Sequence, residues 1–556
     1  MSAETTLEII IQRAIRAPVV WSLVFAAPLA LVWALAARVK LLPATARTLW
    51  GALVLVGASV LVLYAWISGL YLSSCWFMDH CEPTIASLAW YFWNGREIYP
   101  APGTPYFGFQ YGPYLYILNG ILEASAGPSI LAAKLGGVLA GLGALALTYA
   151  LVRRTCTRTV ALLMTAVFAA MQLHFSYFSF IRADSFLVLF VSVACLAATL
   201  PTRWTIVLVG LFLGISVNLK IHAFIYFLPI LAYVKRAVSV RQALAIMAIG
   251  CATWMAPFVV FGNISFPNYM LALSKAVLTH GLDPNASAGI LKWLCLLGTP
   301  LGLAFALAYL QEPEQTRAAL KKNWGLLFVL ALSLAATTLP ASKHGAGPHH
   351  FMPFLPVIVL TALGLYRDGV RFQRFKSKSI PLEAWLASYL ACLFLFAGFQ
   401  LRSMKWAVES NSPGWAELAA EIQGVVQRFG KTHAILMGQA EGPTGGGQYE
   451  LTYLRTMLVF AGMPIGFEPP PLMDAKRAGL DTPRLDDFPN DAKEKPLLWM
   501  IPKGGKPFAL MTWYPPYDHL YDEPFRRDFL SRYGLSGHTP HFDLYTIHFS
   551  DAIPRI

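Results

Sequence analysis

The sequence predicts an α-helical polytopic membrane protein that ends in an α/β domain outside the membrane. Of its 556 residues 56% are hydrophobic and only 13% are charged, a composition far from that of soluble globular domains. Apolar runs of about 20 residues, the length that crosses a bilayer core as a helix, recur along residues 1–400. Residues 401–556 have mixed polarity and many Pro and Gly. These observations separate a membrane domain, 1–400, from a C-terminal domain, 401–556.

The apolar runs predict about twelve transmembrane helices. The first run is long for a signal peptide, so we expect it to be retained. The runs begin near positions 18, 49, 128, 159, 184, 204, 222, 241, 290, 325, 351 and 382.

The net charge of +13 reports the orientation of these helices rather than a nucleic-acid partner. Lys and Arg gather in alternate connectors, which are cytoplasmic by the positive-inside rule. Arg13 and Arg16 favour a cytoplasmic N-terminus, whereas an even number of helices puts it outside, so its side stays open. The basic connectors contain Arg38–Arg47, Arg153–Arg158, Arg203, Lys235–Arg241, Arg317–Lys322 and Arg367–Lys378. The outward segments are then 71–127, 174–183, 218–222, 263–289, 341–350 and 401–556.

Helix and strand signals in the C-terminal domain predict a small α/β module. An amphipathic helix is expected to begin after a cap at Ser412-Pro413. We expect strands at 433–437, 496–501 and 542–549, and helices at 448–462 and 526–532.

The first outer loop, 71–127, carries the acids Asp79 and Glu82 directly after an apolar run. Holding a charge at the mouth of a membrane helix is costly, so a functional site is the default interpretation. Cys75 and Cys81 share this loop. They would form a disulfide in an oxidising compartment if their Cα atoms approach closely, which spacing alone does not decide.

Four outer helix ends each offer a cation, and cations in that layer suit a phosphate. The alternative is snorkelling, in which a basic side chain near a helix end reaches the lipid headgroups. Because the positive-inside rule depletes this side of Lys and Arg, we favour a phosphate site. The four cations are Lys134, Arg182, Lys220 and Lys343.

A third acid, Asp184, stands two residues after Arg182 at an outer helix boundary. A local ion pair or an N-cap would also explain it. Acids that deprotonate a hydroxyl, set beside bases that hold a leaving phosphate, make a group-transfer site.

Three histidines, His344, His349 and His350, follow in the Gly-rich outer connector. Their spacing matches no standard set of zinc ligands, so we favour contacts to phosphate or sugar hydroxyls, with a divalent metal as the alternative. His80 and Tyr111 are weaker candidates for substrate binding.

Four separated segments of the membrane domain resemble GT-C glycosyltransferases, the group that includes the protein O-mannosyltransferases and the lipid A aminoarabinose transferases. The C-terminal domain carries no such resemblance. The segments are Asp79–Tyr99 with Tyr111-Gly112-Pro113, then Arg182-Ala183-Asp184, Asn218-Leu219-Lys220 and Lys343–Pro356.

The resemblance implies a GT-C-like enzyme on the outer face of a bacterial-type inner membrane. It implies that a sugar moves, with inversion, from a polyprenyl-phosphate-linked donor to a hydroxyl of a lipid, glycan or protein acceptor. No cofactor is expected, because cations at the outer leaflet can neutralise the leaving phosphate.

Carried over to this sequence, the resemblance implies roles for particular residues. An acid of the first outer loop is the expected base, Asp184 is expected near a sugar, and Lys220 and Lys343 are expected at the donor phosphate.

The first loop departs from the family pattern. Relatives often show adjacent acids, whereas Cys81 precedes Glu82 here and Asp79 lies three positions before it. Both acids stay candidates, and the spacing to the later Gly favours Glu82.

Two other functions are compatible with the sequence. A transporter or flippase of lipid-linked sugars also needs outer cations, but it tends to have ionisable groups near the midplane and repeated halves. A polysaccharide ligase or polymerase fits the chemistry but less of the motif order. Acids and bases at one face, without an internal repeat, favour the transferase.

Overall fold

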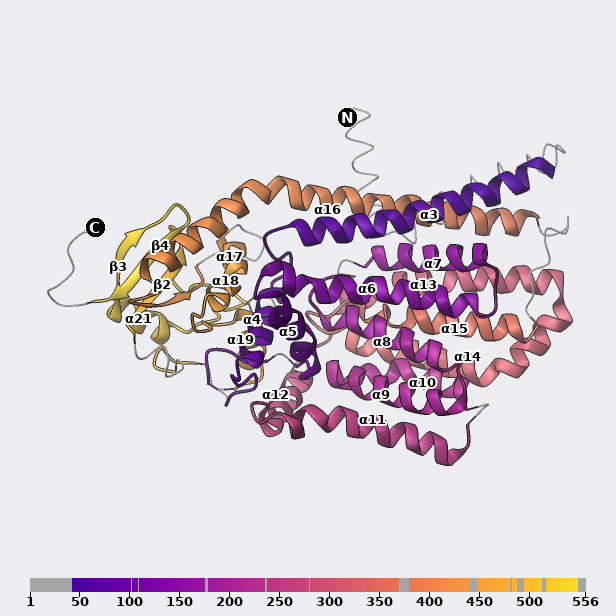
Figure 1. Ribbon diagram of the computed structural model, residues 1–556, viewed down its shortest axis with the longest axis horizontal. Helices are drawn as coiled ribbons and strands as arrows, with labels where there is room; N and C mark the ends of the chain where they lie inside the picture. The colour runs from indigo at the N-terminus through magenta and orange to yellow at the C-terminus, as the bar shows by residue number, and fades with distance from the viewer. Residues whose placement is uncertain are drawn as a thin grey trace.

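The computed structural model describes residues 43–548, except 102, 109, 176–178, 236–237, 280, 370–379, 441–447, 481–482, 488–494 and 513–516. The molecule is elongated, with a helical bundle along most of its length and a small sheet at one end (Figure 1). We call the end of the bundle that faces the sheet the sheet end. The predicted first transmembrane run and the charges at Arg13 and Arg16 lie outside the described residues.

Every apolar run predicted from position 49 onward overlaps a helix of the bundle. Within the part of the chain that the structure describes, six helices are long and apolar enough to cross a bilayer and further apolar helices are shorter, so the expected number of about twelve is not established. The bundle helices are α3 (Pro43–Ser73), α6 (Ile130–Arg153), α7 (Arg158–Leu173), α8 (Ala183–Ala197), α9 (Thr202–Leu219), α10 (Phe224–Val234), α11 (Val240–Val260), α13 (Pro284–Gln311), α14 (Pro313–Ala341), α15 (Phe354–Arg367) and α16 (Ile380–Phe429).

The described residues of the connectors predicted to be cytoplasmic lie at the end of the bundle away from the sheet (Figure 1). Arg154 donates to the carbonyl of Thr199 at 3.1 Å, which joins two of them. Lys322 pairs with Asp368 at 2.6 Å, which joins the start of α14 to the end of α15. These contacts join neighbouring connectors of the same end to one another, and the cytoplasmic location of that end stays a prediction.

Shorter elements cover the sheet end of the bundle. They are α4 (Glu82–Trp93), α5 (Tyr114–Ala126), the short helix η1 (Ile221–Ala223), α12 (Phe266–Thr279) and η2 (Pro348–Phe351). The chain is tightly packed where α5 begins, because a Cβ on Gly112 would lie 1.8 Å from the carbonyl oxygen of Asn218. Glycine at this position lets the first outer loop lie against the end of α9.

The C-terminal part folds around a four-stranded mixed sheet of order β1-β2-β4-β3. β1 and β2 are parallel, and the other two pairings are antiparallel. The strands are β1 (Ala434–Met437), β2 (Leu497–Pro502), β3 (Tyr533–His538) and β4 (Phe542–Ile547). The helices are α17 (Gln448–Leu451), η3 (Thr452–Leu454), α18 (Thr456–Phe460), α19 (Pro469–Arg477) and α21 (Glu523–Arg532).

Each face of the sheet buries its own apolar set, as alternation along a strand requires. Ile435 and Met500 pack with Leu418 and Ile422 of α16 on one face. Trp499 packs with Phe529 and the other aromatic residues of the opposite face.

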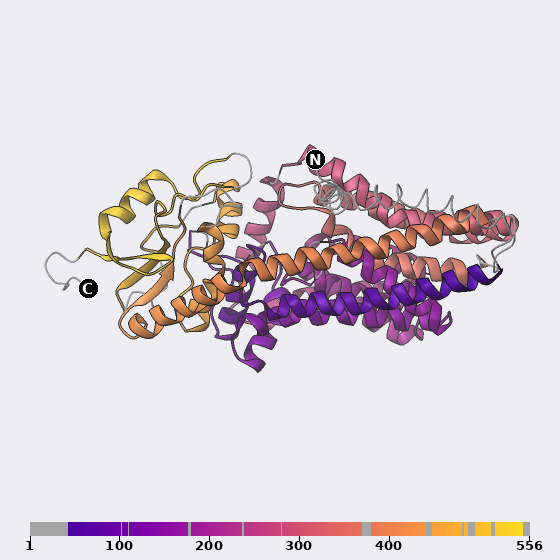
Figure 2. The ribbon, with the colours of Figure 1, turned by 90° about the horizontal axis from the view of Figure 1, so that it is seen from above.

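Two expectations for this part need correction. The helix predicted from Ser412-Pro413 has no start there, because the backbone is helical from Ile380 to Phe429 and an N-cap requires a non-helical residue. Figure 2 shows α16 running from the bundle to the sheet. The predicted helix at 448–462 is divided into α17, η3 and α18. Strand β3 was not predicted.

The C-terminal part is fastened to the first outer loop. Trp415 of α16 stacks on Trp76, with ring centroids 4.7 Å apart. Thr456 donates to the carbonyl of Pro83 at 2.9 Å, and the hydroxyl of Tyr91 accepts from the amide of Ile465 at 2.7 Å. Contacts from residues far apart in sequence therefore fix the loop. Cys75 and Cys81, in contrast, are free thiols in the structure.

Candidate active site

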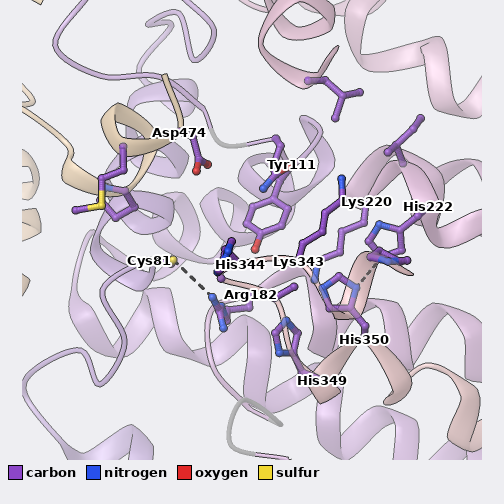
Figure 3. A pocket seen from close by; sticks show the side chains of 18 of the residues that line it. Cys81, Tyr111, Arg182, Lys220, His222, Lys343, His344, His349, His350 and Asp474 are labelled. Carbon is purple, nitrogen blue, oxygen red and sulfur yellow. Dashed lines mark hydrogen bonds between the residues drawn. The ribbon is translucent and has the colours of Figure 1, made fainter. Parts of the chain in front are cut away.

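A cavity of about 150 Å³ opens at the sheet end of the bundle. Basic side chains from three separate segments meet there: Arg182 before α8, Lys220 between α9 and η1, and Lys343 after α14 (Figure 3). The sequence predicts these three cations together with Lys134 as one group, and the structure brings the three of them to one cavity. Tyr111, His80, His344, His349 and His350 also line it.

Lys220 is aimed into the cavity by a break in the helix. Its backbone is extended, with φ −143° and ψ 122°, so α9 ends and η1 starts in a new direction. Its ammonium bonds to Asp184 Oδ1 at 2.7 Å and lies 5.5 Å from the centre of the Tyr111 ring. Burial lowers the pKa of Lys220, and the Asp184 carboxylate acts against that shift. Asp184 thus holds the lysine rather than lining the cavity itself.

Asp79 lies behind the part of the cavity wall formed by His80 and Cys81. Its Oδ1 accepts from the amide of Cys81 at 3.0 Å and is 3.7 Å from Arg182 Nε. Its Oδ2 is 3.7 Å from Nδ1 of His80. Burial alone raises the pKa of Asp79, but Arg182 and His80 oppose it and the net direction is down. Asp79 is therefore an ionised carboxylate beside the cavity at neutral pH.

Glu82 is fully buried, at 0% exposure, and does not line the cavity. Its Oε2 accepts from the amides of Met78 and Asp79 at 2.7 and 3.0 Å. Its Oε1 accepts from the hydroxyl of Tyr71 and from the amide of Ile181 at 3.2 Å. The carboxylate of Glu82 thus joins the first outer loop to the segment before α8, which counts against the preference for Glu82 as the base.

Lys134 also lies away from the cavity, at 0% exposure. Its ammonium donates to the carbonyls of Tyr71, Ser74 and Trp76 at 3.0, 2.9 and 2.6 Å, and to the hydroxyl of Ser74 at 2.5 Å. In this structure the Lys134 ammonium therefore contacts neither the cavity, where a phosphate would bind, nor the surface, where snorkelling would place it. It closes the turn that precedes Asp79.

The histidines form a polar wall on the far side of Lys220. His350 Nδ1 and His222 Nε2 are 3.0 Å apart, and the rings of His349 and His350 lie 4.7 Å apart (Figure 3). His222 was not predicted, although it stands two residues after Lys220. Among the described residues, the one group with three possible metal-ligand atoms within 4.8 Å of one another is Asp79, His80 and Cys81, not the predicted alternative at 344–350.

Three lining residues come from the C-terminal part, namely Pro470, Met473 and Asp474 of α19. Sequence reasoning missed them because no local pattern links α19 to the outer loops. Gln110 and Leu273 complete the wall between the first loop and α12.

Fold and site together define a multi-pass membrane protein in which acids and bases meet at one end of a helical bundle. The same fold occurs in the crystal structure of ArnT from Cupriavidus metallidurans in the apo state, with a TM-score of 0.52 and 12% identity over 90% of this chain and 98% of ArnT. The structure of that ArnT bound to undecaprenyl phosphate aligns with a TM-score of 0.50 and 13% identity over 91% of this chain and 99% of ArnT.

The oligosaccharyltransferase of Archaeoglobus fulgidus aligns with a TM-score of 0.34 and 14% identity over 62% of this chain and 56% of its own, too low to establish a shared fold. No family model and no curated protein sequence matches the chain. ArnT is a lipid A aminoarabinose transferase, so the resemblance expected from the sequence motifs is confirmed at the level of the fold.

Proposed function

We propose that this protein is a membrane glycosyltransferase that moves a sugar from a polyprenyl-phosphate-linked donor to an acceptor hydroxyl. The observation that carries the proposal is the cavity in which three cations, Arg182, Lys220 and Lys343, converge next to the ionised Asp79. The likeness to ArnT, which was crystallised with undecaprenyl phosphate, supports a donor linked to a polyprenyl phosphate.

The cationic wall binds the donor phosphate. Arg182 offers a planar fork of N–H donors, while Lys220 and Lys343 act as compact charges. The side chains of His349 and His350 add ring N–H groups to the same wall. Because these groups are already assembled, they stabilise the charge that builds on the phosphate as it leaves. The counter-charge comes from the chain's own residues, so the proposal assigns no metal.

Asp79 serves as the base. It takes the proton of the acceptor hydroxyl as that oxygen attacks the anomeric carbon, while the bond from that carbon to the phosphate oxygen breaks. The bonding electrons leave with the lipid phosphate, and attack from the opposite face inverts the anomeric centre. Glu82 and Lys134 hold the loop that carries Asp79, and Asp184 orients Lys220.

The transfer takes place on the outer face of a bacterial inner membrane. Basic connectors at the end away from the sheet favour a cytoplasmic location for that end, which puts the cavity outside. The acceptor hydroxyl belongs to a lipid, a glycan or a protein. Acids and bases gathered at one end of the bundle favour a transferase over a flippase, which tends to bind its substrate near the midplane.

Lipid binding by the purified protein in nanodiscs tests the proposal. We expect undecaprenyl phosphate to bind more tightly than undecaprenol, which has the same chain without the phosphate. Lys220→Gln and Lys343→Gln should each weaken binding of undecaprenyl phosphate by about 10-fold or more and leave undecaprenol unaffected, because each removes a charge-assisted contact. Equal affinity of the wild-type protein for both lipids would reject the donor site.

A further inference from the structure

Helix α19 of the C-terminal part forms one wall of the candidate active site. Its Asp474 lines the main cavity and also a second, smaller cavity of about 40 Å³. Gln110 of the first outer loop is the other residue that lines both. Asp474 therefore stands where the two spaces meet.

The wall is fixed to the first outer loop by a buried ionic contact. Glu468, the residue directly before α19, accepts from Arg455 Nη2 at 2.6 Å and from the hydroxyl of Thr84 at 2.5 Å. Arg455 Nη2 also donates to the Thr84 hydroxyl at 2.8 Å. The amide of Glu468 bonds to the carbonyl of Pro105 at 3.2 Å. Since Thr84 lies in α4, directly after the loop that carries Asp79, α19 and that loop keep a set distance.

The cavity has a carboxylate, that of Asp474, on the side opposite Lys220. Figure 3 shows Asp474 on the side away from Lys220 and His350. Burial lowers the pKa of His80 and so do Arg182 and Arg455, whereas Asp79 and Asp474 raise it, so the field of Asp474 reaches the lining of the cavity. If the anionic group of a ligand binds Arg182, Lys220 and Lys343, the rest of the ligand extends across the cavity toward Asp474.

We propose that Asp474 accepts hydrogen bonds from hydroxyls of the transferred sugar, so that the C-terminal part selects the donor. This inference rests on the proposed function, because it takes the donor phosphate to lie on the cationic wall. The sugar is bonded directly to that phosphate and extends from it toward α19. A carboxylate only accepts hydrogen bonds and each sugar hydroxyl can donate one, so the contacts are charge-assisted and stronger than neutral ones.

Under the proposed function, in which Asp79 is the base, Asp474 is a specificity-determining residue. It lies on a helix of a different part of the chain from Asp79, and the ion pair of Glu468 with Arg455 holds that helix in place. Sugars that differ in hydroxyl configuration would meet the carboxylate differently. Undecaprenyl phosphate without a sugar would make no contact with the Asp474 carboxylate.

The test compares the affinities of lipids with and without a sugar. The full-length protein in nanodiscs is titrated with undecaprenyl phosphate and with undecaprenyl phosphate that carries glucose, mannose or arabinose. We expect at least one glycosylated lipid to bind more tightly to the wild-type protein than the bare lipid does. Asp474→Ala should reduce that gain about 10-fold or more, and Asp474→Asn should reduce it less, while both bind bare undecaprenyl phosphate normally.

The matched control is Asp528→Asn, which makes the same change on α21, outside both cavities. It should bind all lipids as the wild-type protein does. The inference is overturned if no sugar improves wild-type binding, or if the gain is unchanged in both Asp474 variants. Failure of the wild-type protein to prefer undecaprenyl phosphate over undecaprenol would instead reject the proposed function. Asp474→Asn preserves shape, so its thermal unfolding shows whether a loss reflects recognition or misfolding.

Discussion

Asp79→Asn and Glu82→Gln together should show which acid is the base. We expect Asp79→Asn to abolish almost all sugar transfer and leave the fold intact. Asn keeps an oxygen for the amide of Cys81, which bonds to Asp79 Oδ1 at 3.0 Å, so the loop conformation should persist. It cannot take up the acceptor proton. Loss of a general base typically slows the reaction about 10²- to 10⁴-fold, and we expect a decrease of that size in sugar transfer.

Glu82→Gln should act on stability instead. Four donors point at the two oxygens of Glu82, whereas a glutamine offers one oxygen and an NH₂ group. If the oxygen keeps the amides of Met78 and Asp79, the hydroxyl of Tyr71 can turn to accept from the NH₂ group. The amide of Ile181 then has no acceptor, and a buried unsatisfied N–H costs about 1–3 kcal/mol.

Both variants are measured in lipid by release of undecaprenyl phosphate from the glycosylated lipid that the wild-type protein uses best. Asp79→Asn should bind that lipid and unfold at the wild-type temperature, but release almost no undecaprenyl phosphate. Glu82→Gln should unfold at a lower temperature. Near-normal transfer by Asp79→Asn, together with a loss of transfer and unchanged stability in Glu82→Gln, would refute the reasoning and make Glu82 the base.

Three further outcomes are expected. Arg182→Met removes the largest influence that lowers the pKa of Asp79 and leaves burial, which raises it. If Asp79 is the base, the acid limb of the transfer rate should therefore move to higher pH, and an unmoved limb would contradict the pairing. Because the C-terminal part is predicted to lie outside, a cysteine in place of the exposed Ser531 should react with a membrane-impermeant thiol reagent in spheroplasts. Labelling only after lysis would contradict this orientation. Gly112→Ala should lower the unfolding temperature, at a cost of about 1–3 kcal/mol, because its Cβ would meet Asn218, and an unchanged temperature would show that the two segments separate easily.

The bundle could be predicted from the sequence because an apolar run long enough to span a bilayer is a local signal. Strand β3 could not, since Tyr533–His538 includes two glycines and a serine and has no regular apolar alternation. It is a strand because it pairs with β4, which is a tertiary contact. The helix start predicted at Pro413 was also wrong. Proline often occupies the first position of a helix, but here it lies inside α16.

The candidate site was predictable in part. Alternation of the helices puts Arg182, Lys220 and Lys343 at one end of the bundle. It puts Lys134 there as well, so tertiary contacts decide which of these cations meet in one cavity. Choosing between two acids three residues apart also depends on tertiary contacts, because the partners of Glu82 include the amide of Ile181, 99 positions along the chain. The place of Asp474 in the cavity could not be predicted either, because it depends on contacts between α19 and outer loops that are far away in sequence.

The fastening of the C-terminal part to the first outer loop has a consequence for protein engineering. A truncation after residue 400 would remove Trp415 from Trp76 and Arg455 from Thr84, and would expose the surface that supports the Asp79 loop. We therefore do not expect residues 1–400 alone to keep the first outer loop in its native conformation. A chimera that exchanges the C-terminal part between two such proteins must exchange the matching α4 as well, because the two segments form a single interlocking module.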